Sequence, residues 1–166
     1  MAKVSGVLTG TAGVYYVASQ LAARGFHAAI THGNAPSVDI FVGLLDGAST
    51  VSLQVKTSSQ ALRTRGRGPK KVPYQYDWVI GERAARLNHP DLFFVFVNLK
   101  GGEFVNTELA KQALPEVFIV PSGAVHSAFN HYTNRYWNWT PGVEEVEPYK
   151  NNWELLRNHL AGKVSQ

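Results

Sequence analysis

Hydrophobic and polar positions repeat with two different periods along this chain, and each period predicts a kind of element. Over residues 11–24 apolar side chains recur at the spacing of one helical face, and Gly25 can end the helix that Thr11 would cap. Alternation with a period of two, or a short apolar run, predicts strands instead. Such stretches cover residues 26–31, 38–45, 50–57, 92–99 and 116–120.

Turn residues separate these stretches. Asp46 and Gly47 predict a tight turn that joins 38–45 to 50–57 as a hairpin, and residues 33–36 form another turn. Further helices are expected over 81–87, 107–113, 122–131 and 151–160, the last in a helical tail that begins near residue 141. The order predicts one α/β domain over residues 1–166, with a mixed sheet of four to five strands flanked by helices.

Composition narrows the class of protein. The chain contains no cysteine, which excludes disulfides, thiolate zinc sites and a cysteine nucleophile. No signal peptide is apparent, and the longest apolar run, residues 92–97, has the length of a buried strand rather than of a membrane span. We therefore expect a cytoplasmic protein without a membrane partner.

Positive charge is concentrated in one stretch of a chain whose net charge is +4. Glycines and prolines within this stretch predict that it lies outside regular structure. A mobile basic loop attracts polyanions, so we interpret it as a contact for nucleic-acid phosphates, the alternative being a solvated loop that only aids solubility. Its basic residues are Arg63, Arg65, Arg67, Lys70 and Lys71.

The predicted hairpin gathers polar side chains on an otherwise apolar sheet. In the strand over 50–57, Gln54 and Lys56 face away from the side taken by Val55. Asp39 lies across from them if the turn centres near Gly47. Because apolar neighbours make such a place costly for an idle charge, the cluster predicts a functional site.

The donor types of this cluster suit phosphodiester chemistry. Mg²⁺, or Mn²⁺ in its place, prefers oxygen ligands, which Asp39, the amide oxygen of Gln54 and the main-chain carbonyl of Val55 can supply. Lys56 would orient or deprotonate the attacking water and offset charge in the transition state. The predicted catalytic residues are therefore Asp39, Gln54 and Lys56.

Asp39 followed by Gln54-Val55-Lys56 resembles the PD-(D/E)xK nuclease superfamily, in the variant where glutamine replaces the second acid. The segment VASQLAARGFHAAITHGNAPSVDIFV is similar to the helix–strand–turn–strand entry of small bacterial members, which include homing endonucleases and resolvase-like domains. The resemblance covers roughly residues 10 to 60. It implies a restriction-endonuclease-like fold, a metal-dependent endonuclease that hydrolyses DNA, and a symmetric homodimer as one mode of assembly.

One position departs from the family pattern. Active relatives usually carry a glutamate just after a glycine like Gly13, whereas this chain has Val14 there and no acidic residue before Asp39. Fewer carboxylates imply weaker Mg²⁺ binding, so another oxygen donor such as Glu82, or the DNA phosphate, would have to complete the shell. The alternative is an inactive nuclease-fold module that binds nucleic acid or a protein without cutting.

Two further interpretations are open. The glycines at positions 6, 10 and 13 resemble a dinucleotide-binding turn, but they do not form G-x-G-x-x-G, so a Rossmann-type protein is the less favoured reading. Aromatic residues near the tail could stack on bases, although packing of the tail onto the domain is the favoured interpretation. These residues are Tyr132, Tyr136, Trp137 and Trp139.

Overall fold

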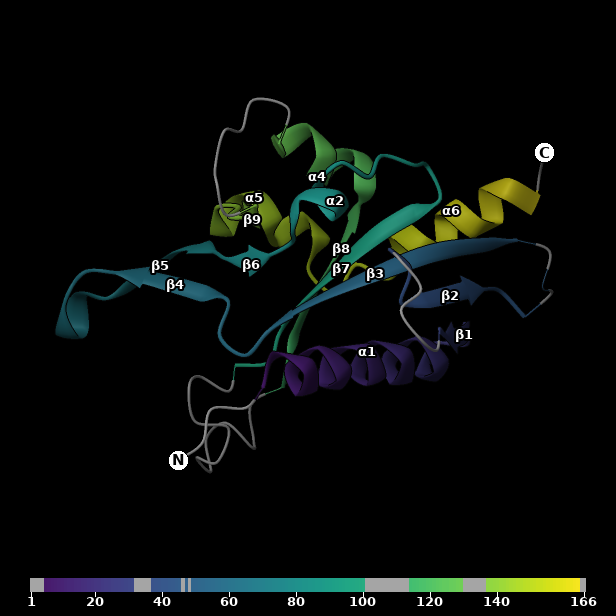
Figure 1. The fold of residues 1–166 in the computed structure, drawn as a ribbon. Helices are drawn as coiled ribbons and strands as arrows, with labels where there is room; N and C mark the ends of the chain where they lie inside the picture. Colours follow the sequence, from purple (N-terminus) through teal and green to yellow (C-terminus); the bar gives the residue numbers. More distant parts are fainter. Residues whose placement is uncertain are drawn as a thin grey trace.

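The computed structural model describes residues 5–31, 37–45, 47, 49–100, 114–129 and 137–164. A five-stranded mixed sheet with the order β1-β2-β3-β7-β8 forms its centre (Figure 1). Strands β3 and β7 are parallel, and the other neighbouring pairs are antiparallel, which confirms the predicted α/β fold. The strands are β1 (His27–Ile30), β2 (Ile40–Gly43), β3 (Thr50–Ser58), β7 (Leu92–Asn98) and β8 (Glu116–Pro121).

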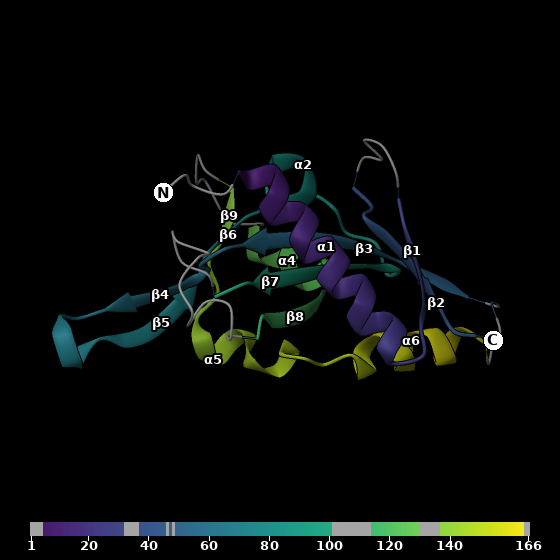
Figure 2. The same ribbon diagram turned by 90° about the horizontal axis from the view of Figure 1, so that it is seen from below.

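Strand β7 is buried on both faces and divides the core into two clusters. Its odd-numbered residues, such as Val95, pack with helices α1 (Gly6–Ala23) and α6 (Glu154–Val164) on one face. Phe94 and Phe96 pack on the other face, against an aromatic layer that includes Trp78 and Trp139. In Figure 2, α1 crosses in front of β3 and β7 while α4 (Ser122–Phe129) lies behind them. The continuous apolar run of β7 follows from this double burial.

Helix α1 begins earlier than its sequence suggests. The predicted cap at Thr11 is wrong, because the helix starts at Gly6 and the Ser5 hydroxyl accepts a hydrogen bond from the Leu8 amide at 3.3 Å. Its end agrees with the prediction, since Gly25 has a φ of 80°, a conformation that favours glycine. The short helix α2 (Glu82–Ala85) and α4 lie within the predicted ranges 81–87 and 122–131.

The basic stretch is a hairpin, and the expectation that it lies outside regular structure is wrong. Strands β4 (Leu62–Arg65) and β5 (Val72–Tyr76) pair in an antiparallel manner with a bulge, and a 3-10 turn, η1 (Gly68–Lys70), closes their tip. The hairpin extends away from the sheet in Figures 1 and 2. Gly66 lies at the tip with a φ of 99°, and a Cβ there would come within 2.3 Å of the Lys70 carbonyl oxygen. The glycines that suggested a loop therefore form the turn.

The C-terminal segment packs against both faces of the sheet. Val146 of α5 (Val143–Val146) belongs to the aromatic cluster, whereas Leu156 and Leu160 of α6 belong to the cluster beneath α1. In the chain, η2 (Glu147–Tyr149) lies between α5 and α6. Strand β9 (Asn138–Trp139) precedes α5 and pairs with β6 (Trp78–Val79). Trp139 is buried, as the packing interpretation requires. Tyr132 and Tyr136 lie outside the described residues, as do the expected turn at 33–36 and the expected helix at 107–113. Within the described ranges no helix is long and apolar enough to cross a membrane.

Candidate active site

Asp39 stands where β2 separates from β3, held by main-chain hydrogen bonds on both sides. Its carbonyl accepts from the Thr31 amide at 3.0 Å, and its amide donates to the Leu53 carbonyl at 2.8 Å. One carboxylate oxygen, Oδ2, accepts from the Val55 amide at 2.7 Å. Two residues earlier, Ser37 has a φ of 78°, a conformation that is uncommon for a residue other than glycine. The carboxylate is therefore fixed at the edge of β3.

The edge of β3 opens directly beside this carboxylate. Pairing with β2 runs from Gly43↔Thr50 to Ile40↔Leu53 and goes no further. Because N–H and C=O of one strand residue point to the same side, the Val55 carbonyl faces the same open edge as the amide that contacts Asp39. A carboxylate oxygen and a main-chain carbonyl thus meet at this edge.

Gln54 carries a polar atom without a protein partner. The residue is buried, 9% exposed, and Oε1 accepts no hydrogen bond from any described residue. It lies beside Phe94 of β7 in the sheet register. Leaving a buried oxygen unpaired is destabilising, typically by about 1–3 kcal/mol. An atom of this kind is a candidate ligand for a group that binds from outside.

Lys56 lies two residues further along β3, beside Phe96. Burial lowers the pKa of its ammonium below the ordinary value of 10.5, and the charge of Asp39 opposes that shift by raising the pKa. Nevertheless no carboxylate of the described residues lies within ion-pair distance of Lys56. The structure thus brings Asp39, Gln54 and Lys56 to one part of β3. The charge of Asp39 raises the pKa of Lys56, although the two side chains form no ion pair.

Val14 reaches the same place from α1. An open hollow of about 350 Å³ lies between α1 and the sheet, and both Val14 and Asp39 line it together with Val55. The close approach of the helix depends on Gly13, where a Cβ would come within 1.9 Å of the Thr57 hydroxyl. Position 14 is therefore next to the candidate site, and an acid there would face Asp39.

The donors present suit a divalent cation only in part. Asp39 supplies a carboxylate, Gln54 an unpaired amide oxygen and Val55 a carbonyl, all of the oxygen type that Mg²⁺ prefers. Across the described ranges no group of three or more histidine, aspartate and glutamate side chains could hold a metal. Glu82 is ion-paired with Arg86 at 2.7 Å on the exposed surface of α2. Asp39 and Val55 line the same hollow, and Gln54 neighbours Val55 on β3.

The five basic residues of the hairpin differ in what they contact. Arg63 donates from Nε and a terminal nitrogen to Asp77 at 3.2 and 3.0 Å, and the guanidinium of Arg65 lies 5.9 Å from the Tyr74 ring centre. The other three side chains are exposed and form no ion pair with any described residue. They are Arg67, Lys70 and Lys71.

A second polar cluster, centred on Glu116, has no local sequence signature. Its Oε2 accepts from Tyr76 at 3.2 Å and from Asn98 at 3.0 Å, while Oε1 contacts the ammonium groups of Lys100 and Lys150 at 3.3 and 3.0 Å. Burial works against the charge of Glu116, yet these hydrogen bonds and cations outweigh it and hold its pKa below the usual range. The pKa of the Tyr76 hydroxyl is raised by burial and by Glu116.

Comparison with known proteins supports the fold. No family model and no curated protein matches this sequence. A solved structure, that of the bacterial homing endonuclease I-Ssp6803I, is similar with a TM-score of 0.56 and 17% identity, over 98% of this chain and 99% of that chain. At this identity the likeness shows the fold alone. The chain thus has an endonuclease-like fold, as its sequence predicted.

Proposed function

We propose that this protein is a metal-dependent endonuclease that hydrolyses phosphodiester bonds in DNA, with a PD-(D/E)xK-type site in which glutamine replaces the second acid. The single observation that carries the proposal is the open edge of β3. Asp39 has its carboxylate fixed there by the Val55 amide, between Gln54 and Lys56 in the chain, and neither the Gln54 Oε1 nor the Lys56 ammonium is paired with a described residue. The fold shared with a homing endonuclease supports the same reading.

Asp39, Gln54 and the Val55 carbonyl would hold Mg²⁺ or Mn²⁺. When bound, the ion would offset charge on the scissile phosphate and lower the pKa of a water molecule. Asp39 contributes the negative charge, and its hydrogen bond from Val55 fixes the carboxylate before substrate arrives. Gln54 contributes an oxygen that loses no protein hydrogen bond when it turns to a ligand.

Lys56 would accept a proton from the attacking water or offset the charge that develops on the phosphate. Its pKa is lowered by burial, so the ammonium releases a proton from Nζ more readily than an exposed lysine does. As an ammonium it offsets charge on the phosphate oxygens, and as an amine it accepts a proton from the attacking water. The basic residues of the β4–β5 hairpin would bind backbone phosphates.

Cleavage assays with matched variants test this proposal. Asp39→Ala and Lys56→Ala should each abolish cleavage of linear and branched DNA in Mg²⁺ or Mn²⁺, while circular dichroism shows an intact fold. Glu154→Ala removes an exposed carboxylate of α6 and should leave cleavage unchanged. Full activity in both site variants would sink the assignment.

Calorimetry separates metal binding from catalysis. Mg²⁺ or Mn²⁺ should bind the wild-type chain, with or without a short duplex, and binding should be lost in Asp39→Ala. The absence of binding under every condition would favour the second candidate function, a module that binds nucleic acid or a protein without cutting. Val14, an apolar residue that faces Asp39 across the hollow, is the observation that favours this second candidate.

A further inference from the structure

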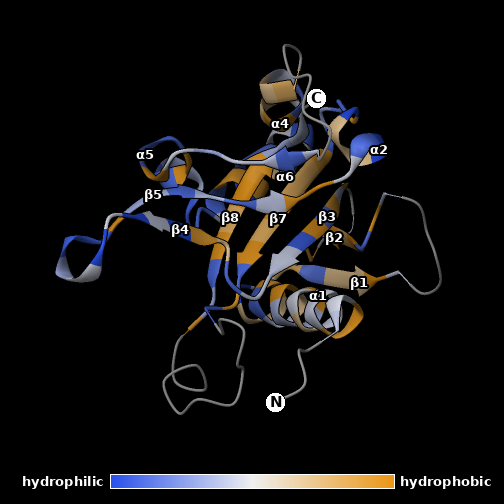
Figure 3. Ribbon diagram, turned by 60° about the vertical axis from the view of Figure 1, so that its left-hand side comes forward, coloured by the Kyte–Doolittle hydropathy of each residue, from blue (hydrophilic) through white to orange (hydrophobic). Residues whose placement is uncertain are grey.

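The β4–β5 hairpin, residues 62–76, differs from the rest of the surface in charge. It contains five of the sixteen basic residues and none of the twelve acidic residues. The remainder of the chain therefore has eleven basic and twelve acidic residues, so the net positive charge of the protein resides in this one hairpin. Figure 3 shows it as a hydrophilic projection beside an apolar sheet.

The base of the hairpin is fixed to the body of the protein. Asp77 accepts a hydrogen bond from Arg63 on one carboxylate oxygen and from Asn138, at 2.8 Å, on the other. The Tyr76 ring stacks on Trp78 with centres 5.1 Å apart, and its amide donates to Pro141 at 2.9 Å. An arm held in this way does not need to be ordered when a partner binds, which favours affinity.

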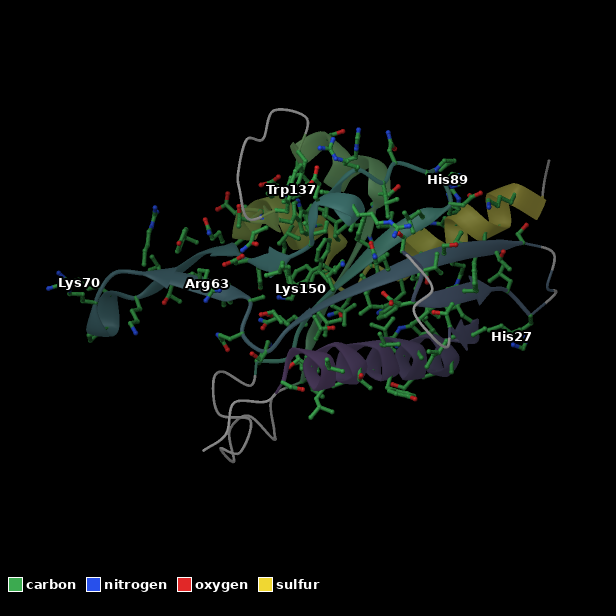
Figure 4. All side chains as sticks on the ribbon, in the orientation of Figure 1. His27, Arg63, Lys70, His89, Trp137 and Lys150 are labelled. Carbon is green, nitrogen blue, oxygen red and sulfur yellow. The ribbon has the colours of Figure 1, made fainter. Side chains whose placement is uncertain are left out.

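The tip is also preformed, and it carries the free cations. The Lys70 and Lys71 amides donate to Arg67 and Gly68 carbonyls at 3.1 and 3.2 Å, which closes the turn. In Figure 4, Lys70 points into solvent at the far end of the hairpin while Arg63 lies closer to the body. The cationic side chains of the tip are thus displayed on a rigid turn.

The dimensions of the hairpin suit the major groove of DNA. Strand β4 advances three residues from Leu62 to Arg65, which is roughly 10 Å at the rise of an extended strand, and the turn that contains η1 extends beyond it. The major groove of B-DNA is about 12 Å wide and 8.5 Å deep and admits a two-stranded ribbon, whereas the minor groove is about half as wide. Duplex RNA has a deep, narrow major groove that side chains do not read.

Acidic residues limit how much of the arm can contact DNA. A hollow of about 470 Å³ separates Arg65 and Tyr74 from Glu144 and Glu145 of α5. These carboxylates would repel phosphates close to the body, so they confine contact to the distal part of the arm.

We infer that the β4–β5 hairpin is a rigid arm that inserts its tip into the major groove of duplex DNA. Arg67 is the tip residue suited to a bidentate contact with guanine, whereas Lys70 and Lys71 suit phosphates on the groove walls. The inference rests on the proposed DNA substrate and adds the groove and the residues that enter it.

Salt dependence gives a first test, on duplex DNA of random sequence without divalent metal. Lys71→Gln should weaken binding and make the slope of log K against log salt shallower by about 0.9, the value of one phosphate contact. Arg83→Gln removes one charge from an exposed arginine of α2 and should leave the slope unchanged. Equal slopes in the two variants would overturn the role of the tip.

Cross-linking tests the groove, because the chain contains no cysteine of its own. Lys70→Cys should form a disulfide, by exchange that releases a small thiol, with duplex that carries a tether ending in a mixed disulfide on cytosine N4, in the major groove, and not with the same tether on guanine N2, in the minor groove. Arg83→Cys should react with neither. Minor-groove cross-linking, or none by a variant that still binds duplex, would overturn the inference.

The same experiment separates the two proposals. Cross-linking in the major groove by a chain that never cleaves would leave the arm assigned and sink the endonuclease. Cleavage that depends on Asp39, without major-groove cross-linking, would support the endonuclease and overturn the role of the arm.

Discussion

Two polar clusters lie in the same sheet, and they differ in how completely their atoms are paired. Around Glu116, both carboxylate oxygens have partners from β5, β7 and the C-terminal segment. Around Asp39, the Gln54 oxygen has no partner and the Lys56 ammonium forms no ion pair with any described residue. Paired polar groups stabilise a fold, whereas unpaired ones weaken it and remain free for a ligand. The contrast favours a structural role for Glu116 and supports the proposal that the Asp39 cluster is the functional site.

The largest effect is expected at the paired cluster. Glu116→Ala leaves buried Tyr76 and Asn98 groups without an acceptor, and we expect the free energy of unfolding to fall by roughly 2–4 kcal/mol. Urea denaturation measures this loss, and Glu144→Ala is the exposed control. A loss below about 1 kcal/mol would contradict the comparison, because exposed carboxylates have effects of that size.

At the unpaired cluster around Asp39, a substitution is expected to raise the free energy of unfolding. Gln54→Met keeps the length of the side chain but removes the unpaired oxygen, so the free energy of unfolding should rise by about 1 kcal/mol. Gln60→Met, at an exposed position, should change it little. Metal binding should be lost at the same time. Destabilisation by Gln54→Met would indicate that Oε1 has a partner in solution.

A second carboxylate at position 14 sharpens the contrast within the site. Val14→Glu places an acid across the hollow from Asp39, and we expect Mg²⁺ affinity to rise roughly tenfold because affinity follows the ligand charge. The increase in melting temperature on adding Mg²⁺ measures it. Val7→Glu, on an exposed part of the same helix, should give no such increase. Equal responses would show that residue 14 does not reach the ion.

Acid should weaken the paired cluster selectively. The pKa of Glu116 is held below its ordinary value of 4.5, so its contribution to stability is complete above that pH. The contribution is lost as the pH falls through the lower pKa of the folded state. The difference in unfolding free energy between wild type and Glu116→Gln should therefore shrink below about pH 4.5. A difference that grows in acid would contradict this account.

The smallest effect concerns Lys56. Asp39 raises the pKa of this ammonium against the effect of burial, so Asp39→Asn should lower it further. The side-chain NMR signal of Lys56, followed against pH, gives the value directly. An unchanged pKa would mean that the two residues lie beyond electrostatic reach.

The sequence predicted the elements whose patterns are local. Alternation along β3 placed Gln54 and Lys56 on the face opposite Val55, and the apolar run of β7 has the length that double burial requires. Other features depend on contacts between distant residues. Glu116 gathers partners from residue 76 to residue 150, and no spacing rule connects them.

The two wrong predictions, a loop in the basic stretch and a helix start at Thr11, have physical causes as well. Glycines in the basic stretch predicted a loop, but Gly66 provides the backbone conformation that a hairpin tip requires. Helix α1 continues before Thr11 through Gly6 and Gly10, both poor helix formers, with Ser5 as its cap. Propensity alone did not identify this first turn.

The position of Val14 also has a consequence for inheritance. Every valine codon differs by a single base from a codon for aspartate or glutamate. Because Gly13 already seats the helix against Thr57, no other part of the fold has to move for residue 14 to face Asp39. A lineage with this chain therefore stands one point mutation from a second carboxylate in the proposed site, and can gain or lose that group without changing its architecture.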